Sequence, residues 1–497
     1  MLLRNSLWNV SGMALPAIVA LATVPFLIHA LGTDGYGIVT IVGSLIGYFA
    51  ILDINLTAGA IKYLSEAHAR GDRQRFAETF WFGAFFYGGL GILGALLILL
   101  GAGWLVDSFF KIPPSLREET HLALKIGALG FAITQIENYL IVVPQALQRY
   151  DRSARSEVFF GVVVNIASVA VALAGGGIVG VIAVRVAVAS LNFFYLIHLI
   201  QGLDVHIGLR WPRKEVRSSL VSFSAYAYLS KLAMLMHQHG DKLIVGALAG
   251  PTALTFYTVP VTLAGRILGL TYRLSSVIYP RASALAAVDR FDEFHPVYIG
   301  AMRYITYINL VALGVIVLAG DQFLRHWVGP EFVALGYPVL ILMTVALLMD
   351  SITNIPSLVN DALGHPRVSG SFAMARGVVG VALVWLGTTY GGIVGAAAAH
   401  FVASALLSLL FLAFVHGRTV PIPFADAMRG GWGKSLLVGA LIFCAMFPLK
   451  WLLPAGIATT VVVSGMAVLA LAGAGLAFIL GGDERAALVA AARRLRG

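Results

Sequence analysis

Four basic side chains lie deep within long apolar stretches of the sequence, where they would face hydrocarbon unless they line a cavity: Arg185, Lys231, Arg266 and Arg273. A charged side chain at the centre of a bilayer costs at least about 2.5 kcal/mol, so such bases usually serve binding or pairing. Arg266 and Arg273 are seven positions apart and therefore lie on one face of a helix, with Gly269 between them. Because guanidinium and ammonium groups pair well with phosphate oxygens, we predict that these four residues bind an anionic substrate group.

Three carboxylates, Asp53, Glu137 and Asp350, also fall within apolar stretches. An ionised carboxylate is untenable in hydrocarbon, so each must pair with a base, take up a proton or bind a cation. The sequence leaves two roles open for them. One is charge balance through structural ion pairs, and the other is coupling to a proton or sodium gradient.

Motifs for other kinds of chemistry are missing from the sequence. It has neither a G-x-x-x-x-G-K-[S/T] phosphate loop nor a nucleophile elbow, so it gives no support to ATP hydrolysis or serine esterase activity. His237 and His239 lie near Asp241, but no further ligand-like residue follows at a metal spacing. We therefore predict no catalytic residues, no metal site and no cofactor, and a protein that is not an enzyme.

The composition indicates which elements must position these side chains. Of the 497 residues, 59% are hydrophobic and 12% are charged, against roughly a quarter charged in a soluble domain. Apolar stretches long enough to cross a bilayer recur along the chain, which predicts an all-α polytopic membrane protein. We predict fourteen spans, at residues 6–31, 37–61, 79–105, 123–147, 157–174, 178–200, 219–247, 254–280, 297–319, 334–357, 371–388, 393–415, 434–453 and 456–480.

The basic residues outside the spans are distributed unevenly. With the N-terminus inside, 22 Lys and Arg residues fall in cytoplasmic segments and five fall on the opposite side, which is the positive-inside bias of membrane proteins. We predict that both termini are cytoplasmic. The net charge of +10 reflects this topology, so we expect no nucleic-acid partner.

An internal repeat organises the spans. The sequence Gly-Gly-Ile-Val-Gly occurs at residues 176–180 and again at 391–395, 215 positions later. Nearly the same offset, larger by one residue, aligns Ala146-Leu147 with Ala362-Leu363. The offset contains six predicted helices, an even number, so both copies enter the membrane with the same orientation. Parallel copies predict two six-helix lobes around a central cavity, which is an arrangement typical of transporters.

The predicted lobes comprise residues 1–216 and 217–420, and residues 421–497 add two transmembrane helices and a cytoplasmic tail. At the repeat offset, Arg185 superposes on His400. Each lobe would then carry a potentially basic side chain at the same position. We therefore include His400 as a fifth candidate for binding the anionic group.

Several short motifs follow one another in a characteristic order and spacing, and together they resemble one family. They are Leu31-Gly32-Thr33-Asp34-Gly35-Tyr36-Gly37-Ile38, Asp53-Ile54-Asn55-Leu56, Thr252-Ala253-Leu254-Thr255-Phe256-Tyr257, Trp327-Val328-Gly329-Pro330-Glu331-Phe332 and Ala362-Leu363-Gly364-His365-Pro366. The chain resembles the polysaccharide-type, Wzx-like flippases of the multidrug/oligosaccharidyl-lipid/polysaccharide exporter superfamily. Many relatives have Asp-x-Gly-Leu where this chain has Asn55.

The resemblance implies a flippase that moves undecaprenyl-pyrophosphate-linked oligosaccharide repeat units across the bacterial inner membrane by alternating access. The product would be used for O-antigen or exopolysaccharide biosynthesis. The basic residues would contact the pyrophosphate, and the polyprenyl tail would stay in lipid between the lobes. Membrane lipids, a glycan polymerase and other polysaccharide-assembly proteins are the partners that it implies.

Three other functions stay open at this point. A multidrug or cation antiporter of the same superfamily would be expected to line its cavity mainly with acids and aromatics, whereas deep bases here at least equal acids. A peptidoglycan lipid-precursor flippase would need similar substrate chemistry. A membrane glycan polymerase or ligase is disfavoured, because such enzymes usually have a large external loop and the longest predicted outer loop is roughly 18 residues.

Overall fold

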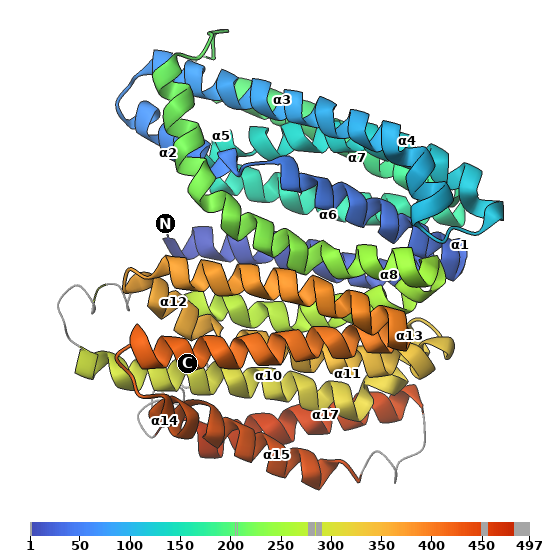
Figure 1. Cartoon of the computed structure of the whole chain (residues 1–497), viewed down its shortest axis with the longest axis vertical. Coiled ribbons are helices and arrows are strands. Elements are labelled where there is room, and N and C mark those ends of the chain that lie inside the picture. Colours follow the sequence, from blue (N-terminus) through green and yellow to red (C-terminus); the bar gives the residue numbers. More distant parts are fainter. Residues whose placement is uncertain are drawn as a thin grey trace, which may run out of the picture. The chain divides into compact units, whose positions relative to one another are not determined.

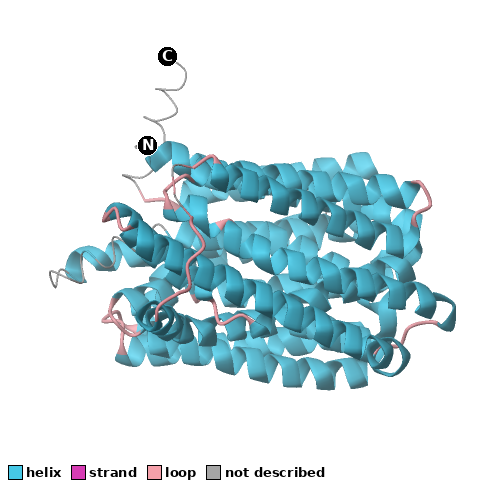
Figure 2. Ribbon diagram, turned by 90° about the horizontal axis from the view of Figure 1, so that it is seen from above, coloured by secondary structure: helices cyan, strands magenta, loops and turns pink. Residues whose placement is uncertain are grey.

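The computed structural model describes residues 2–276, 284, 291–448 and 456–481, except residues 204 and 206. Within these ranges it describes no side chains for residues 2–14, 222–227, 229–231, 267–274, 276, 291–292 and 457. The described residues form helices joined by short loops, and no strand occurs among them (Figure 2).

The chain divides into two compact units, Met1–Thr255 and Phe256–Gly497. In the first unit, helix α3 packs against α4, α4 against α7, and α6 against both α1 and α7. Its elements are α1 (Leu2–Phe49), η1 (Ala50–Leu52), α2 (Leu56–Ala69), α3 (Arg73–Trp104), η2 (Leu105–Phe109), η3 (Pro114–Leu116), α4 (Arg117–Leu140), α5 (Val142–Ala146), α6 (Tyr150–Leu173), α7 (Gly177–Gln201) and the larger part of α8 (Lys214–Ser276).

The second unit begins within α8. There α10 packs against α11, α15 and α17, and α11 packs against α13. Its other elements are α10 (Phe291–Trp327), α11 (Glu331–Ser351), α12 (Asn354–Ala362), α13 (Pro366–Arg418), α14 (Phe424–Asp426), η4 (Ala427–Gly433), α15 (Lys434–Met446), α17 (Ile457–Ala474) and η5 (Gly475–Ile479).

Three helices are too long to be single membrane spans. Helix α1 has 48 residues, which would extend about 72 Å at the usual rise of 1.5 Å per residue, whereas the hydrocarbon core of a bilayer is only about 30 Å thick. Helices α1, α8 and α13 are each broken by a glycine with non-helical backbone angles, at Gly32, Gly250 and Gly392 respectively. Figure 1 shows the chain turning back on itself within α1 and within α13.

These breaks account for the number of spans. Ten helices among the described residues are long and apolar enough to cross a membrane. Three of the ten contain a glycine at which the helix is broken. Dividing these three, and adding α15, whose described part is 13 residues long, reproduces the fourteen predicted spans. The predicted fold class, an all-α polytopic membrane protein, is confirmed.

The repeat is visible in the backbone itself. Three pairs of residues adopt left-handed φ angles at corresponding places: Gly32 (71°) and Gly250 (87°), Gln148 (58°) and Gly364 (89°), and Gly177 (59°) and Gly392 (57°). The last pair is the second glycine of each Gly-Gly-Ile-Val-Gly motif. The two copies therefore make the same local turns at matching positions, as expected for a duplicated chain. The lobe boundaries at residues 216 and 420 stay a prediction.

Close helix packing positions the polar residues of the first unit. A Cβ atom on Gly83 of α3 would lie 2.1 Å from the Tyr139 ring of α4, so only glycine permits this approach. The Tyr139 hydroxyl donates to the backbone carbonyls of Thr79 and Phe80, at 3.1 and 2.9 Å. Helices α3 and α4 are thereby held in one register.

Candidate functional site

Asp53 lies in a break between helical segments. The sequence predicted one continuous span over residues 37–61, and this prediction is wrong, since the helical structure stops at Leu52 and resumes at Leu56. Asp53 is extended and Asn55 adopts a left-handed conformation with φ 60° and ψ 40°. The Asp53 carboxylate accepts the Asn55 backbone N–H at 2.9 Å, and such side-chain turns compete with helix formation. Asn tolerates the left-handed region better than most residues, which explains why it can replace a glycine here.

Further hydrogen bonds hold Asp53 within this break. Its side chain is buried, with 5% of the residue exposed. The Tyr87 hydroxyl of α3 donates to the carboxylate at 2.7 Å and accepts the Thr57 backbone N–H at 3.2 Å. The Tyr87 ring stacks on Tyr139 with centroids 5.3 Å apart. Interrupted helices inside a membrane occur where the backbone is buried in protein or lines a cavity, so Asp53 stays a candidate site residue.

Glu137 belongs to a hydrogen-bonded chain across three helices. The Asn192 side-chain amide of α7 donates to the Glu137 carboxylate at 2.6 Å, and the Ser156 hydroxyl of α6 donates to the Asn192 carbonyl oxygen at 2.6 Å. Glu137 is buried and forms no ion pair with any basic side chain in the described ranges. A buried carboxylate held only by neutral donors is well suited to exchange a proton or to bind a cation.

Asp350 has a different environment, because it forms an ion pair. The Arg376 guanidinium of α13 donates to the Asp350 carboxylate of α11 at 2.7 Å and to the Ser408 hydroxyl at 3.2 Å. A ring nitrogen of His400 lies within 4.8 Å of an Asp350 carboxylate oxygen. Two of the predicted site residues, Asp350 and His400, are thus brought together. Arg376 was not selected from the sequence, although an arginine within an apolar stretch was the signal that could have identified it.

The polar side chains around Glu137 and those around Asp350 are arranged alike in the two copies of the repeat. Because Gly177 corresponds to Gly392, the two parts of α13 correspond to α6 and α7, and α11 corresponds to α4. In each copy a carboxylate on the first helix is linked to polar side chains on the other two. The first copy uses neutral partners, whereas the second uses an arginine. Among the described side chains, the acid is therefore neutralised by an ion pair only in the second copy.

The basic candidates differ in how they are held. The Arg185 Nε atom of α7 donates to the Ser168 hydroxyl of α6 at 3.3 Å, and Tyr36 lies close enough to interact with the guanidinium electrostatically. Arg266 is exposed on α8 and has no hydrogen bond or ion pair to any described residue. The side chains of Lys231 and Arg273 lie outside the described residues, so the stripe formed by Arg266 and Arg273 stays a prediction.

The two corresponding turns of the repeat, at Gly32 and Gly250, contact each other within the first unit. The Thr252 hydroxyl donates to the Asp34 carboxylate, and the Thr255 hydroxyl donates to the Thr33 carbonyl oxygen at 2.7 Å. A Cβ atom on Gly37 would lie 2.1 Å from the Pro251 carbonyl oxygen. The turn after Gly32 therefore packs backbone to backbone on the turn after Gly250.

This contact predicts unequal effects for two alanine substitutions in α1. Gly37→Ala should lower the free energy of unfolding by about 1–3 kcal/mol, because the new methyl group meets backbone that cannot rotate away. Gly43→Ala is the matched control, since nothing lies within 4 Å of a Cβ atom there. Thermal unfolding of the purified variants in one detergent compares them. Equal midpoints for the two variants would show that the turns are not tightly packed.

An apolar groove lies within the second unit, between α10, α11 and α15. It has a volume of about 270 Å³, and the described residues that line it are all uncharged. The lining residues are Leu310, Leu313, Gly314, Val317, Ile341, Val345, Leu436, Gly439, Ala440 and Phe443. The sequence did not predict this groove, because it depends on how α15 packs against α10.

Comparison with known proteins identifies the family. A family model described as polysaccharide biosynthesis protein matches residues 29–333, more than half of the chain. The chain belongs to this family. A candidate O-antigen transporter of Shigella flexneri is 21% identical over 425 residues, covering 84% of this chain and 98% of that protein.

Solved structures share the fold of this chain. An inward-facing multidrug resistance MATE family transporter of the MOP superfamily superposes with a TM-score of 0.69 at 14% identity, over 84% of this chain and 99% of that one. The lipid II flippase MurJ, in an inward closed conformation, superposes with a TM-score of 0.68 at 13% identity, over 94% of this chain and 98% of that one. The family predicted from the sequence is confirmed, and at these identities the structures establish the fold alone.

Proposed function

We propose that this protein is a flippase that moves undecaprenyl-pyrophosphate-linked oligosaccharide units across the bacterial inner membrane by alternating access, for O-antigen or exopolysaccharide biosynthesis. The observation that carries the proposal is membership of the polysaccharide biosynthesis protein family together with a fold shared with a lipid-precursor flippase. The transporter relative from Shigella flexneri matches over nearly its whole length, which supports transport and not enzymatic synthesis.

The basic side chains supply a chemical reason for this cargo. A pyrophosphate carries negative charge, and arginine binds phosphate oxygens with paired N–H donors. Arg266 is exposed without a partner among the described residues, and Arg185 is held only by neutral groups. We assign substrate contacts to these two residues, to Lys231 and Arg273 on sequence grounds, and to His400 as a weaker fifth.

The apolar groove supports a lipid-linked substrate. A polyprenyl chain needs a continuous apolar surface, and the described residues that line the groove beside α15 are all apolar. We propose that it holds part of the tail while the charged head group contacts the basic residues. This division would keep the tail in contact with lipid throughout transport.

Location and partners follow from the same proposal. The chain is a multi-pass membrane protein, and we propose that it resides in the bacterial inner membrane with both termini in the cytoplasm. There the bases of the α2–α3 turn would face the cytoplasm. A glycan polymerase and other polysaccharide-assembly proteins would receive the translocated units on the opposite side.

Gene deletion and complementation test the function in cells. Deletion should abolish the surface polysaccharide and cause an undecaprenyl-pyrophosphate-linked glycan to accumulate, and a plasmid copy should reverse both effects. Lipid extracts analysed by mass spectrometry would identify the accumulated glycan. Accumulation of a peptidoglycan precursor would favour the peptidoglycan branch instead, and altered drug sensitivity without any accumulated lipid would favour an antiporter.

We propose that a proton or sodium gradient drives transport, and Glu137 provides a test of this coupling. Replacement with glutamine keeps the shape of the side chain but removes the carboxylate that can take up and release a proton. Glu137→Gln should therefore lower gradient-driven transport by about tenfold or more, since a positioned proton-transfer group typically contributes about 10²–10⁴-fold. The measurement is flipping in proteoliposomes with and without an imposed gradient. Glu157→Gln, an exposed carboxylate on α6, is the control. If Glu137→Gln responds to the gradient as the wild type does, Glu137 is not the coupling group.

A further inference from the structure

A polar pocket lies in the first unit, and its lining contains none of the acidic and basic candidates described above. It has a volume of about 200 Å³ and lies between the turn that joins α2 to α3 and the segment after α7, which contributes Val205. The turn is fixed by Gly71, which has a φ of 67° and ends α2. The Asp72 N–H donates to the Ala67 carbonyl oxygen at 2.9 Å, which is the hydrogen bond of a Schellman turn.

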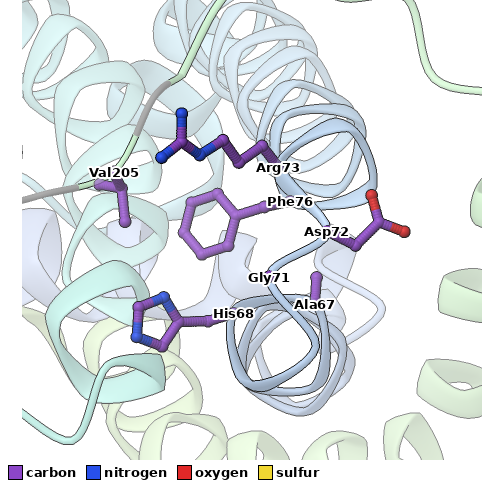
Figure 3. Close-up of a pocket in the computed structure, with 7 residues that line it drawn as sticks. All are labelled: Ala67, His68, Gly71, Asp72, Arg73, Phe76 and Val205. Atoms are coloured by element: carbon purple, nitrogen blue, oxygen red, sulfur yellow. The ribbon is translucent and has the colours of Figure 1, made fainter.

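Two potentially cationic side chains face this pocket. Figure 3 shows the Arg73 guanidinium and the His68 imidazole on either side of the Phe76 ring. The His68 and Phe76 rings contact edge to face, with centroids 6.5 Å apart. Phe76 is buried, so it forms an apolar wall between the two polar groups.

The acidic side chain at the pocket does not pair with the two bases. The Asp72 carboxylate points away from the two bases (Figure 3) and accepts the Arg75 backbone N–H at 2.9 Å. The nearby Arg70 is neutralised by Glu66 at 2.8 Å. In contrast, neither Arg73 nor His68 has a hydrogen bond or ion pair to another side chain in the part of the chain that the structure describes. Their donors are therefore available to a ligand.

We propose that this pocket binds a phosphate group through Arg73 and His68. A guanidinium and an imidazole that face one pocket from either side of the Phe76 ring offer several N–H donors to phosphate oxygens, and the ring accommodates an apolar substituent next to the phosphate. The pocket lies where the long apolar helix α3 begins, and the start of a membrane-spanning helix is where lipid head groups are expected. The phosphate can belong to an anionic phospholipid or be free in solution. The proposal does not depend on the transported cargo.

Binding to the full-length protein tests the site with two probes. One probe is inorganic phosphate, added to the protein in detergent. The other is phosphatidylglycerol, provided in nanodiscs made with phosphatidylcholine and compared with nanodiscs of phosphatidylcholine alone. The unfolding midpoint reports binding, and native mass spectrometry counts retained lipids. The variants are Arg73→Ala and His68→Gln, and the matched control is Arg70→Ala, which removes the same charge three residues away from Arg73 but outside the pocket.

We expect Arg73→Ala and His68→Gln each to weaken binding by about tenfold or more, because each removes a charge-assisted hydrogen bond to the phosphate. Arg70→Ala should bind as the wild type does. Arg73 is exposed and makes no contact that folding requires, so gel filtration should show an unchanged monodisperse protein. A response to phosphatidylglycerol identifies a lipid head group, and a response to inorganic phosphate alone identifies the free anion. No response to either probe, or equal losses in Arg73→Ala and Arg70→Ala, would overturn the proposal.

Discussion

Replacing Arg376 with alanine should lower the free energy of unfolding by about 3–5 kcal/mol, because it leaves the Asp350 carboxylate in a largely buried site without its counter-charge. The two side chains are only 18% and 16% exposed, and their N···O distance is 2.7 Å. The same substitution also frees the Ser408 hydroxyl. Thermal unfolding in one detergent measures the loss.

Two further variants separate the ion pair from the loss of side-chain volume. Asp350→Leu with Arg376→Met should recover most of the lost stability, since replacing both members of a buried pair by apolar groups is often neutral. Arg367→Ala, near the start of the same helix and exposed, should have little effect. If Arg376→Ala unfolds at the same temperature as Arg367→Ala, the ion pair does not stabilise α11 against α13.

Arg266→Glu should reduce polysaccharide export by about 100-fold or more while the protein still accumulates in the membrane. A charge-assisted hydrogen bond contributes about 1.5–3 kcal/mol, and charge reversal adds repulsion between glutamate and pyrophosphate. Folding should be unaffected, because Arg266 is exposed and contacts no polar partner among the described residues. From its place on the same helical face, Arg273→Glu is expected to act likewise.

The assay for this prediction is surface polysaccharide in a deletion strain that expresses each variant, with membrane levels checked by immunoblotting. Arg325→Glu is the control, because it reverses the charge of an exposed residue at the end of α10. Cells that express this variant should export polysaccharide normally. Arg266→Lys should retain part of the activity, because it keeps the charge but loses the paired geometry. Normal polysaccharide with both Arg266→Glu and Arg273→Glu would remove these residues from the substrate site.

Much of the fold could be predicted because it depends on local composition. The spans follow from hydropathy. The repeat follows from motifs whose glycines are required by the backbone conformation at those positions. Gly177 and Gly392 both adopt left-handed angles that a residue with a Cβ atom disfavours. The glycines that revealed the repeat in the sequence therefore lie at matching turns in the structure.

The site was less predictable because its contacts join residues far apart in the chain. Glu137 is bonded by Asn192, 55 positions away, and Asp350 by Arg376, 26 positions away. Hydropathy identified the acids as unusual but could not name their partners. It also missed the break at Asp53, since the side-chain turn and the Tyr87 hydrogen bond that interrupt the helix do not change the apolar character of the stretch.

The central claim is that this chain moves a lipid-linked oligosaccharide from one leaflet to the other, and reconstitution measures this directly. Purified protein in proteoliposomes would be given an undecaprenyl-pyrophosphate oligosaccharide, and the fraction reaching the opposite leaflet would be followed with an impermeant lectin or glycosidase. We expect the wild type to transfer the lipid much faster than empty liposomes, and Arg266→Glu to match the empty liposomes. Equal rates for wild type, Arg266→Glu and empty liposomes would contradict the assignment as a flippase.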